Sequence, residues 1–289
     1  MKKIIRLLAY FGIFLDNLKI HGINYSGVKN SKVLQEFYLN KNTEIEMFIF
    51  LKSVNYDSMI DVGAYFGYFS IYFDKIKENS KVVAFEADSD NFTMLKQFIN
   101  SNKSNVKAFN KAVGDSSGKI SFYKPIYVGA TKYPSHGQIG DPSKQDNNLY
   151  KDKKYIQHTI EMVSLKSIVG EFVQGQTLLK LDIEGYEEKA LRSAKDQLTK
   201  LQDLDLIVEI MINDTNTKDI FLFLKDCGYS AYLMTNAGLI AEERPLVLPK
   251  ANQNPLDGKL RTVWKNHFFT KRSADEIKEI NLKAYMYNI

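Results

Sequence analysis

Short runs of hydrophobic residues recur through the middle of the chain, and most of them lead into stretches with helical spacing. The first run, residues 59–62, passes through a glycine-containing turn at residues 63–67 into apolar positions that repeat at helical intervals from Tyr68. Continuous apolar runs of four to six residues are typical of strands buried on both faces of a parallel sheet. The alternation of strands and helices predicts an α/β fold.

Similar patterns predict the rest of the core. Strands are expected at residues 58–62, 81–86, 106–109, 178–182, 204–209, 229–234 and 261–269. Helices are expected at residues 67–77, 88–100, 219–227 and 274–285 and from Gly185 onward. Two extra strands, 118–123 and 158–163, flank the polar stretch 124–157, which is long enough to act as a substrate lid.

The first 57 residues precede this core and predict a helical N-terminal cap, followed by one domain at 58–289. Residues 33–54 have apolar positions at helical intervals. Residues 1–15 have a basic start and an apolar middle, which indicates a helix packed on the domain. Peripheral membrane contact by this helix is the alternative.

Composition limits the class of protein. The chain has 289 residues and a formal net charge of +5, which is too small and too scattered to favour nucleic acid as a partner. The single cysteine, Cys227, excludes an intrachain disulfide and fits a reducing cytoplasm. No apolar stretch approaches the ~20 residues that span a bilayer. The oligomeric state stays open.

The glycine turn carries the first candidate chemistry. Gly63 suits a turn where backbone passes close to a ligand, because it has no Cβ. The spacing of Gly63 and Gly67 departs from the pattern of pyrophosphate binders. Asp61 adds a negative charge that would repel pyrophosphate but suit a sulfonium with an ammonium group, which favours S-adenosylmethionine (SAM). Glu86 ends the next strand, at the distance where a carboxylate grips ribose hydroxyls.

Two later strands also end in carboxylates. Asp182 follows the apolar run 178–181, and Glu209 follows the run 204–208. These strands are expected to be neighbours, so the two side chains should converge and could bind a divalent ion, orient a hydroxyl or share a proton. Glu184 and Glu187 fall in the first turn of the next helix, where the helix dipole alone favours acidic residues.

Four blocks in this order resemble the FkbM-type SAM-dependent methyltransferases over roughly residues 55–235. They are DVGA…GYFS from Asp61, AFE at residues 84–86, AVGD at 112–115 and LKLDIEGYE at 179–187. The last block is the most specific. The family usually has Asn where this chain has Tyr65.

The resemblance implies a Rossmann-like class I methyltransferase: a seven-stranded, mostly parallel sheet with helices on both faces. It also implies O-methylation of a hydroxyl on a sugar, glycan or other small molecule, with polysaccharide biosynthesis as a setting. In the related fold the turn at residues 111–113 lies against adenine. We therefore expect cofactor contacts from Asp61, Gly63, Ala64, Tyr65, Gly67, Glu86, Ala87, Lys111, Ala112, Val113 and Asp182.

For catalysis, Asp182 is the candidate base or hydroxyl-orienting group, with Glu184 and Glu209 in support. A base helps because a hydroxyl must lose its proton during methyl transfer. A divalent metal between Asp182 and Glu209 stays an alternative. Two other functions stay open: a nicotinamide-dependent oxidoreductase, which the glycine spacing disfavours, and a non-catalytic SAM-fold subunit that binds glycans.

Overall fold

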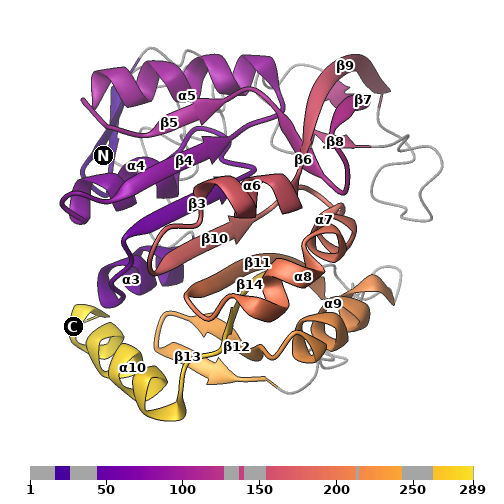
Figure 1. Ribbon diagram of the computed structural model, residues 1–289. Helices are drawn as coiled ribbons and strands as arrows, with labels where there is room; N and C mark the ends of the chain where they lie inside the picture. The colour runs from indigo at the N-terminus through magenta and orange to yellow at the C-terminus, as the bar shows by residue number, and fades with distance from the viewer. Residues whose placement is uncertain are drawn as a thin grey trace, which may run out of the picture.

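The protein folds into a central β-sheet between two layers of helices (Figure 1). A computed structural model describes residues 17–26, 44–126, 137–139, 154–212, 215–242 and 263–288. Within these ranges the large sheet has eight strands in the order β13-β12-β14-β11-β10-β3-β4-β5. Their bounds are β3 Ser58–Val62, β4 Lys81–Phe85, β5 Lys107–Phe109, β10 Thr177–Leu181, β11 Leu204–Ile212, β12 Ser230–Thr235, β13 Gly238–Ala241 and β14 Val263–Thr270.

The five strands from β5 to β11 are parallel, and chain order reverses between β3 and β10. Both β4 and β10 pair with β3 in parallel, and β11 pairs with β10 in parallel. Carboxyl ends of all five strands therefore lie along one edge of the sheet. A crevice opens there between strands whose connections leave in opposite directions, and open α/β sheets bind their ligands in such crevices.

Helices cover both faces of the sheet, as the near-continuous apolar strands require. One hydrophobic cluster joins the sheet to α3 Ile45–Ser53, α4 Tyr68–Ile76, α5 Ser89–Ser101 and α10 Ala274–Asn288. The opposite cluster joins it to α6 Leu165–Phe172, α7 Glu187–Ser193, α8 Lys195–Lys200 and α9 Thr215–Asp226.

The expected seven strands are all present, and β13 adds an eighth as a hairpin partner of β12. Among the boundaries that differ, one affects the site: β11 continues to Ile212, so Glu209 lies within the strand rather than at its end. The strand continues because β14 pairs with it in antiparallel register over residues 206–212. The expected helix at 88–100 is confirmed as α5, and its N-cap Asp88 accepts hydrogen bonds from the N–H groups of Asp90 and Asn91.

The two extra strands are also confirmed, in a smaller sheet with the order β6-β9-β7-β8. The two long strands of this sheet, β7 and β9, pair along nine residues. Of the stretch expected to form a lid, residues 127–136 and 140–153 lie outside the described residues. The bounds are β6 Ala112–Gly114, β7 Gly118–Ile126, β8 Gln138–Ile139 and β9 Lys154–Ser164.

The helical N-terminal cap is wrong for residues 17–26, which form the hairpin β1 Asn17–Ile20 and β2 Ile23–Ser26. His21 and Gly22 make its two-residue turn with φ of 47° and 86°, the left-handed geometry of tight hairpins. Ile20, Ile23 and Tyr25 of the hairpin are buried in the core. Of the helix expected at 33–54, α3 is confirmed; residues 1–16 and 27–43 lie outside the described residues.

Candidate active site

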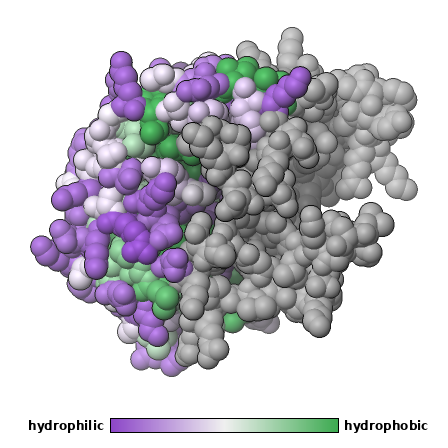
Figure 2. Space-filling view, turned by 90° about the vertical axis from the view of Figure 1, so that its right-hand side faces the viewer, coloured by the Kyte–Doolittle hydropathy of each residue, from purple (hydrophilic) through white to green (hydrophobic). Residues whose placement is uncertain are grey.

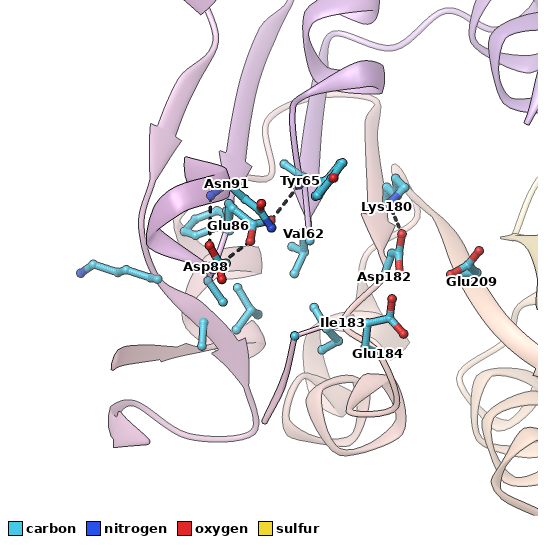
Figure 3. Close-up of a pocket in the computed structure, with 18 of the residues that line it drawn as sticks. Val62, Tyr65, Glu86, Asp88, Asn91, Lys180, Asp182, Ile183, Glu184 and Glu209 are labelled. Atoms are coloured by element: carbon cyan, nitrogen blue, oxygen red, sulfur yellow. Dashed lines mark hydrogen bonds and ion pairs between the residues drawn. The ribbon is translucent and has the colours of Figure 1, made fainter. Parts of the chain in front are cut away.

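A cavity of about 240 Å³ opens at the carboxyl ends of β3, β4 and β10 (Figure 3). Gly63 lies at its centre, with φ of 80°. A Cβ atom on Gly63 would lie 1.6 Å from the backbone oxygen of Asp182, so only glycine allows the loop after β3 to pass the end of β10. The N–H groups of Gly63 and Ala64 both donate to the carbonyl of Phe85, at 2.9 and 3.0 Å. These contacts draw three strand ends together around the cavity.

Glu86 forms the wall of one half of the cavity. Its side-chain oxygens accept hydrogen bonds from the backbone N–H groups of Tyr65 and Asp88, both at 2.8 Å. Burial raises the pKa of Glu86 to about 7, against the opposing effect of these two donors. The side chain of Asn91 also donates to this carboxyl, which is thereby held in one orientation and keeps lone-pair capacity for a hydroxyl.

Beyond Glu86 the wall becomes apolar. Val113 comes from β6, Phe122 from β7 and Ile139 from β8, so the smaller sheet closes this end. Phe122 and Ile139 are directly opposite each other on paired strands and are buried at 5% and 6% exposure. Apolar side chains, one of them aromatic, around one fixed carboxylate suit a nucleoside, whose base is aromatic and whose ribose is a diol.

Carboxylates line the opposite end of the cavity. Figure 3 shows Asp182 and Glu184 beside each other, with Glu209 facing them from the neighbouring strand. Lys180 holds Asp182 through an ion pair of 2.9 Å. Burial, followed by the negative charges of Asp182 and Glu44, raises the pKa of Glu209 well above its ordinary value. This end can therefore accept hydrogen bonds from hydroxyls, attract positive charge and take up a proton.

Three non-glycine residues at the cavity have a left-handed backbone. The φ angles are 49° at Glu44, 51° at Tyr65 and 56° at Glu184. Such conformations cost on the order of 1–3 kcal/mol each and cluster at functional sites, where the surrounding structure holds them. Their gathering around one cavity marks it as the functional centre.

Asp61 is not among the residues that line the cavity, so its expected contact with the cofactor stays a prediction. Its side chain is 1% exposed, accepts a hydrogen bond from Ser70 and lies 3.9 Å from the ammonium of Lys180. The cause is sheet register, because Asp61 and Lys180 are direct partners on β3 and β10. The negative charge that pointed to a sulfonium is therefore compensated by Lys180 beneath the cavity.

Gly67 also lies away from the cavity. It is the N-cap of α4 with φ of 76°, and a Cβ atom there would lie 2.5 Å from the side chain of Leu95. Close packing of α4 on α5 therefore accounts for this glycine. Glu187 has a structural role: its carboxyl accepts hydrogen bonds from the N–H groups of Ile183 and Gly185 in the loop before α7. The sequence placed Glu187 in the first helical turn, as observed, but these hydrogen bonds add a role beyond the helix dipole.

The other expected site residues do line the cavity: Gly63, Ala64, Tyr65, Glu86, Ala87, Lys111, Ala112, Val113, Asp182, Glu184 and Glu209. Sequence reasoning missed several others: Glu44, Tyr68, Phe69, Asp88, Asn91, Phe122, Ile139 and Lys180. The sequence could have indicated Lys180 and Asp88, because Lys180 is two residues before Asp182 and Asp88 is two residues after Glu86. Glu44 and Phe122 carried none, because tertiary packing alone brings them to the cavity.

Within the described ranges, no group of three or more His, Cys, Asp or Glu side chains is placed to hold a metal ion. The alternative of a metal between Asp182 and Glu209 therefore has no support from the geometry. None of the helices in the described ranges is both long enough and apolar enough to cross a membrane.

Comparison with known proteins decides the family. Residues 61–231 match the family described as "Methyltransferase FkbM domain", which is more than half of the chain. The chain belongs to the FkbM methyltransferase family. Methyltransferase 1 of Beauveria bassiana (strain ARSEF 2860) is 26% identical over 196 residues, covering 65% of this chain and 74% of the fungal protein.

Solved structures similar to this FkbM methyltransferase include a putative transferase from Pyrococcus horikoshii. It is 12% identical, with a TM-score of 0.45 over 94% of this chain and 84% of that one. A putative methyltransferase from Streptococcus mutans in complex with SAH is 12% identical, with a TM-score of 0.41 over 79% and 97% of the two chains. The strand order seen here, with its reversal between β3 and β10, is that of the class I methyltransferase fold that was expected.

Proposed function

We propose that this FkbM methyltransferase transfers a methyl group from SAM to a hydroxyl of a sugar or glycan. The observation that carries the proposal is the division of one cavity into two chemically different ends. One end has a fixed carboxylate beside apolar walls, and the other has several carboxylates around the end of β10. A nucleoside bearing a positively charged group matches that division.

The residues present fit SAM. The carboxyl of Glu86 is oriented by two backbone donors and can accept both ribose hydroxyls in a forked arrangement. Val113, Phe122 and Ile139 would contact the adenine. The carboxylates of Asp182 and Glu209 favour a cation at the other end. When bound, SAM supplies an electrophilic methyl group for displacement by the acceptor oxygen.

The chain itself has to orient the acceptor and take its proton. Asp182 is suited to orientation, because the ion pair with Lys180 fixes its carboxylate. Alignment of the reacting atoms can account for much of the rate. The acceptor oxygen loses one proton as it forms the new bond to carbon, and Glu209 is suited to receive it, since burial raises the pKa of its carboxyl well above the ordinary value. Glu184 would accept a hydrogen bond from a neighbouring hydroxyl.

Charge at the acceptor end favours a neutral acceptor that is rich in hydroxyls. Asp182, Glu184, Glu209 and Glu44 all line this end, and the ammonium of Lys180 is already paired with two carboxylates. An anionic acceptor would be repelled, whereas sugar hydroxyls donate well to carboxylates. Figure 2 views the molecule from the edge where the parallel strands end, and hydrophilic side chains cover much of the described part of that face. We therefore propose a glycan acceptor, in a polysaccharide pathway.

Calorimetric titration with S-adenosylhomocysteine (SAH) tests the cofactor assignment. Wild-type protein should bind SAH at micromolar concentration, and Glu86→Ala should weaken binding by at least about tenfold, because each hydrogen bond to a charged group contributes roughly 1.5–3 kcal/mol. Glu171→Ala, which changes an exposed glutamate on α6, is the matched control and should leave the affinity unchanged. Absence of SAH binding to the wild type, or tighter binding of NAD, would refute the proposal.

A further inference from the structure

Two residues outside the segment matched by the FkbM family belong to the acceptor end of the cavity, one as a lining residue and one as its hydrogen-bond partner. Glu44 precedes residue 61 and lines the cavity from the start of α3. Asn266 follows residue 231 and lies on β14, where its side chain is buried at 4% exposure. Neither is part of the family match, so the flanking segments add their own chemistry to the site.

Strand register places Asn266 beside Glu209. The two residues are direct partners on β11 and β14, so their side chains project from the same face of the sheet. On that face Ile207 and Phe268, two residues earlier along β11 and two later along β14, are buried in the core with α3 and α4. The Asn266 side chain donates a hydrogen bond to the carboxyl of Glu44. Asn266 therefore holds Glu44 over the strand pair that carries Glu209.

The backbone at Glu44 supports a role in the cavity. Glu44 is the N-cap of α3, yet its φ of 49° and ψ of 32° are left-handed and its side chain makes no capping hydrogen bond. N-cap residues usually have an extended backbone and a short side chain that accepts from the first turn. The strained conformation instead directs the carboxyl away from α3 and into the cavity.

Several charged groups face Glu44 and Glu209. Lys180 comes from β10, Asp182 and Glu184 from the loop after it and Glu46 from α3. Burial raises the pKa of Glu44 to about 7; Lys180 opposes this rise, while Asp182 and Glu46 add to it. The pKa of Glu209 is raised by burial first and then by Asp182 and Glu44. Two carboxyls in this position cannot both ionise easily near neutral pH.

Resting on the proposed function, we propose that Glu44 and Glu209 form a proton-accepting pair that keeps a proton until a positively charged donor enters the cavity. Asn266 is the positioning residue that holds Glu44 in the pair. Binding of the sulfonium would expel the proton to solvent, and the ionised pair could then take the proton of the acceptor hydroxyl. The pair would thus be fully ionised only when the methyl donor is present.

The size of the effect follows from Coulomb's law. At an effective dielectric constant of about 20, a unit positive charge within about 8 Å shifts the protonation equilibrium of a carboxyl by more than tenfold. A carboxyl with a pKa of about 7 is half protonated at pH 7. Full ionisation of Glu44 on binding would therefore release about half a proton per protein, with a further contribution from Glu209.

SAM and SAH together isolate this effect, because SAH lacks the sulfonium charge but has the same nucleoside and amino-acid groups. Each ligand is titrated calorimetrically at pH 7 in two buffers of different ionisation enthalpy, and the difference in observed enthalpy gives the protons released. We expect SAM to release about half a proton or more beyond SAH with wild-type protein. Glu44→Gln should remove at least half of this excess, and Asn266→Ala should reduce it.

Glu171→Gln, on the exposed face of α6, is the matched control and should keep the full excess. Glu209→Gln gives a second measurement if Glu44→Gln fails to fold, and it should also lower the excess. Equal proton release with SAM and SAH in the wild type, or an unchanged excess in both variants, would overturn the inference while leaving SAM binding intact. Failure of both ligands to bind would instead refute the proposed function and this inference with it.

Discussion

Lys180 lines the cavity and pairs with two carboxylates, and replacing it with methionine tests how the site is held. Its ammonium is 3% exposed, lies 2.9 Å from Asp182 and 3.9 Å from Asp61, and rests over the ring of Phe69 at 5.6 Å. Burial alone would lower the pKa of this ammonium, but the carboxylates of Asp182 and Asp61 raise it above its ordinary value. Methionine keeps most of the aliphatic stem and removes only the charge.

The expected loss comes mainly from Asp61. Asp182 is 25% exposed and can regain water, whereas Asp61 is 1% exposed and would have only Ser70 as a partner. Removing one member of a buried ion pair costs roughly 3–5 kcal/mol, because the other charge is left without compensation. Lys180→Met should therefore lower the free energy of unfolding by about 3–5 kcal/mol at neutral pH.

The loss should depend on pH in a defined direction. Burial raises the pKa of Asp61, and removing Lys180 takes away the main charge that opposes the rise. A carboxyl whose pKa is raised by folding binds its proton more tightly in the folded state, so its contribution to stability is full at low pH and is lost as pH rises through the folded-state pKa. The deficit of Lys180→Met relative to the wild type should thus shrink as pH falls from 8 to 5.

Urea unfolding followed by circular dichroism at pH 8, 7 and 5 measures these differences. Lys278→Met, at an exposed ion pair on α10, is the matched control and should change stability by less than about 0.5 kcal/mol. The double variant Lys180→Met with Asp61→Asn removes both charges and should recover part of the loss. A deficit below about 1 kcal/mol, or one that grows at acidic pH, would refute this account of the buried pair.

Two further substitutions address the glycine turn and the far end of the sheet. The Gly63→Ala variant should have a much lower melting temperature than the Gly22→Ala variant. Both glycines have a left-handed backbone, with φ of 80° and 86°, but only at Gly63 would a Cβ atom meet the backbone oxygen of Asp182. Equal melting temperatures would contradict the steric argument. Arg272→Met should lower the free energy of unfolding by roughly 2–4 kcal/mol in urea titrations, since Arg272 pairs at 2.6 Å with the buried carboxylate of Asp205. An unchanged free energy of unfolding would mean that the other hydrogen-bond donors to Asp205 are enough to stabilise its carboxylate.

The parallel core could be predicted from the sequence because its signals are local. Each strand is a short apolar run, and capping residues such as Asp88 mark where helices begin. The carboxylates at Glu86 and Asp182 could be assigned to the cavity for the same reason, since residues that follow buried parallel strands must lie at one edge of the sheet. Strand neighbours followed from the resemblance to a known family rather than from the residues themselves.

Other features depend on contacts between distant segments. The sequence places Asp61 at the end of a strand, but only sheet register shows that its partner is Lys180 rather than a ligand. Glu44 and Asn266 are separated by more than 200 residues and meet only because α3 packs on the face of the sheet from which the Asn266 side chain projects. The hairpin at residues 17–26 was missed because two strands of four residues carry little periodicity.

The position of β14 in the sheet also determines when the sheet can be completed during synthesis of the chain. Val263–Thr270 is the last of the described strands along the chain, yet it lies between β11 and β12 and pairs with both. On the ribosome, at about 5–20 residues per second, β11 and β12 emerge a few seconds before their common partner. Until then the apolar strand β11 has one unpaired edge, a feature that promotes aggregation. Synthesis of the final strand, rather than completion of the matched domain, therefore closes the sheet and ends the nascent chain's exposure to misassembly.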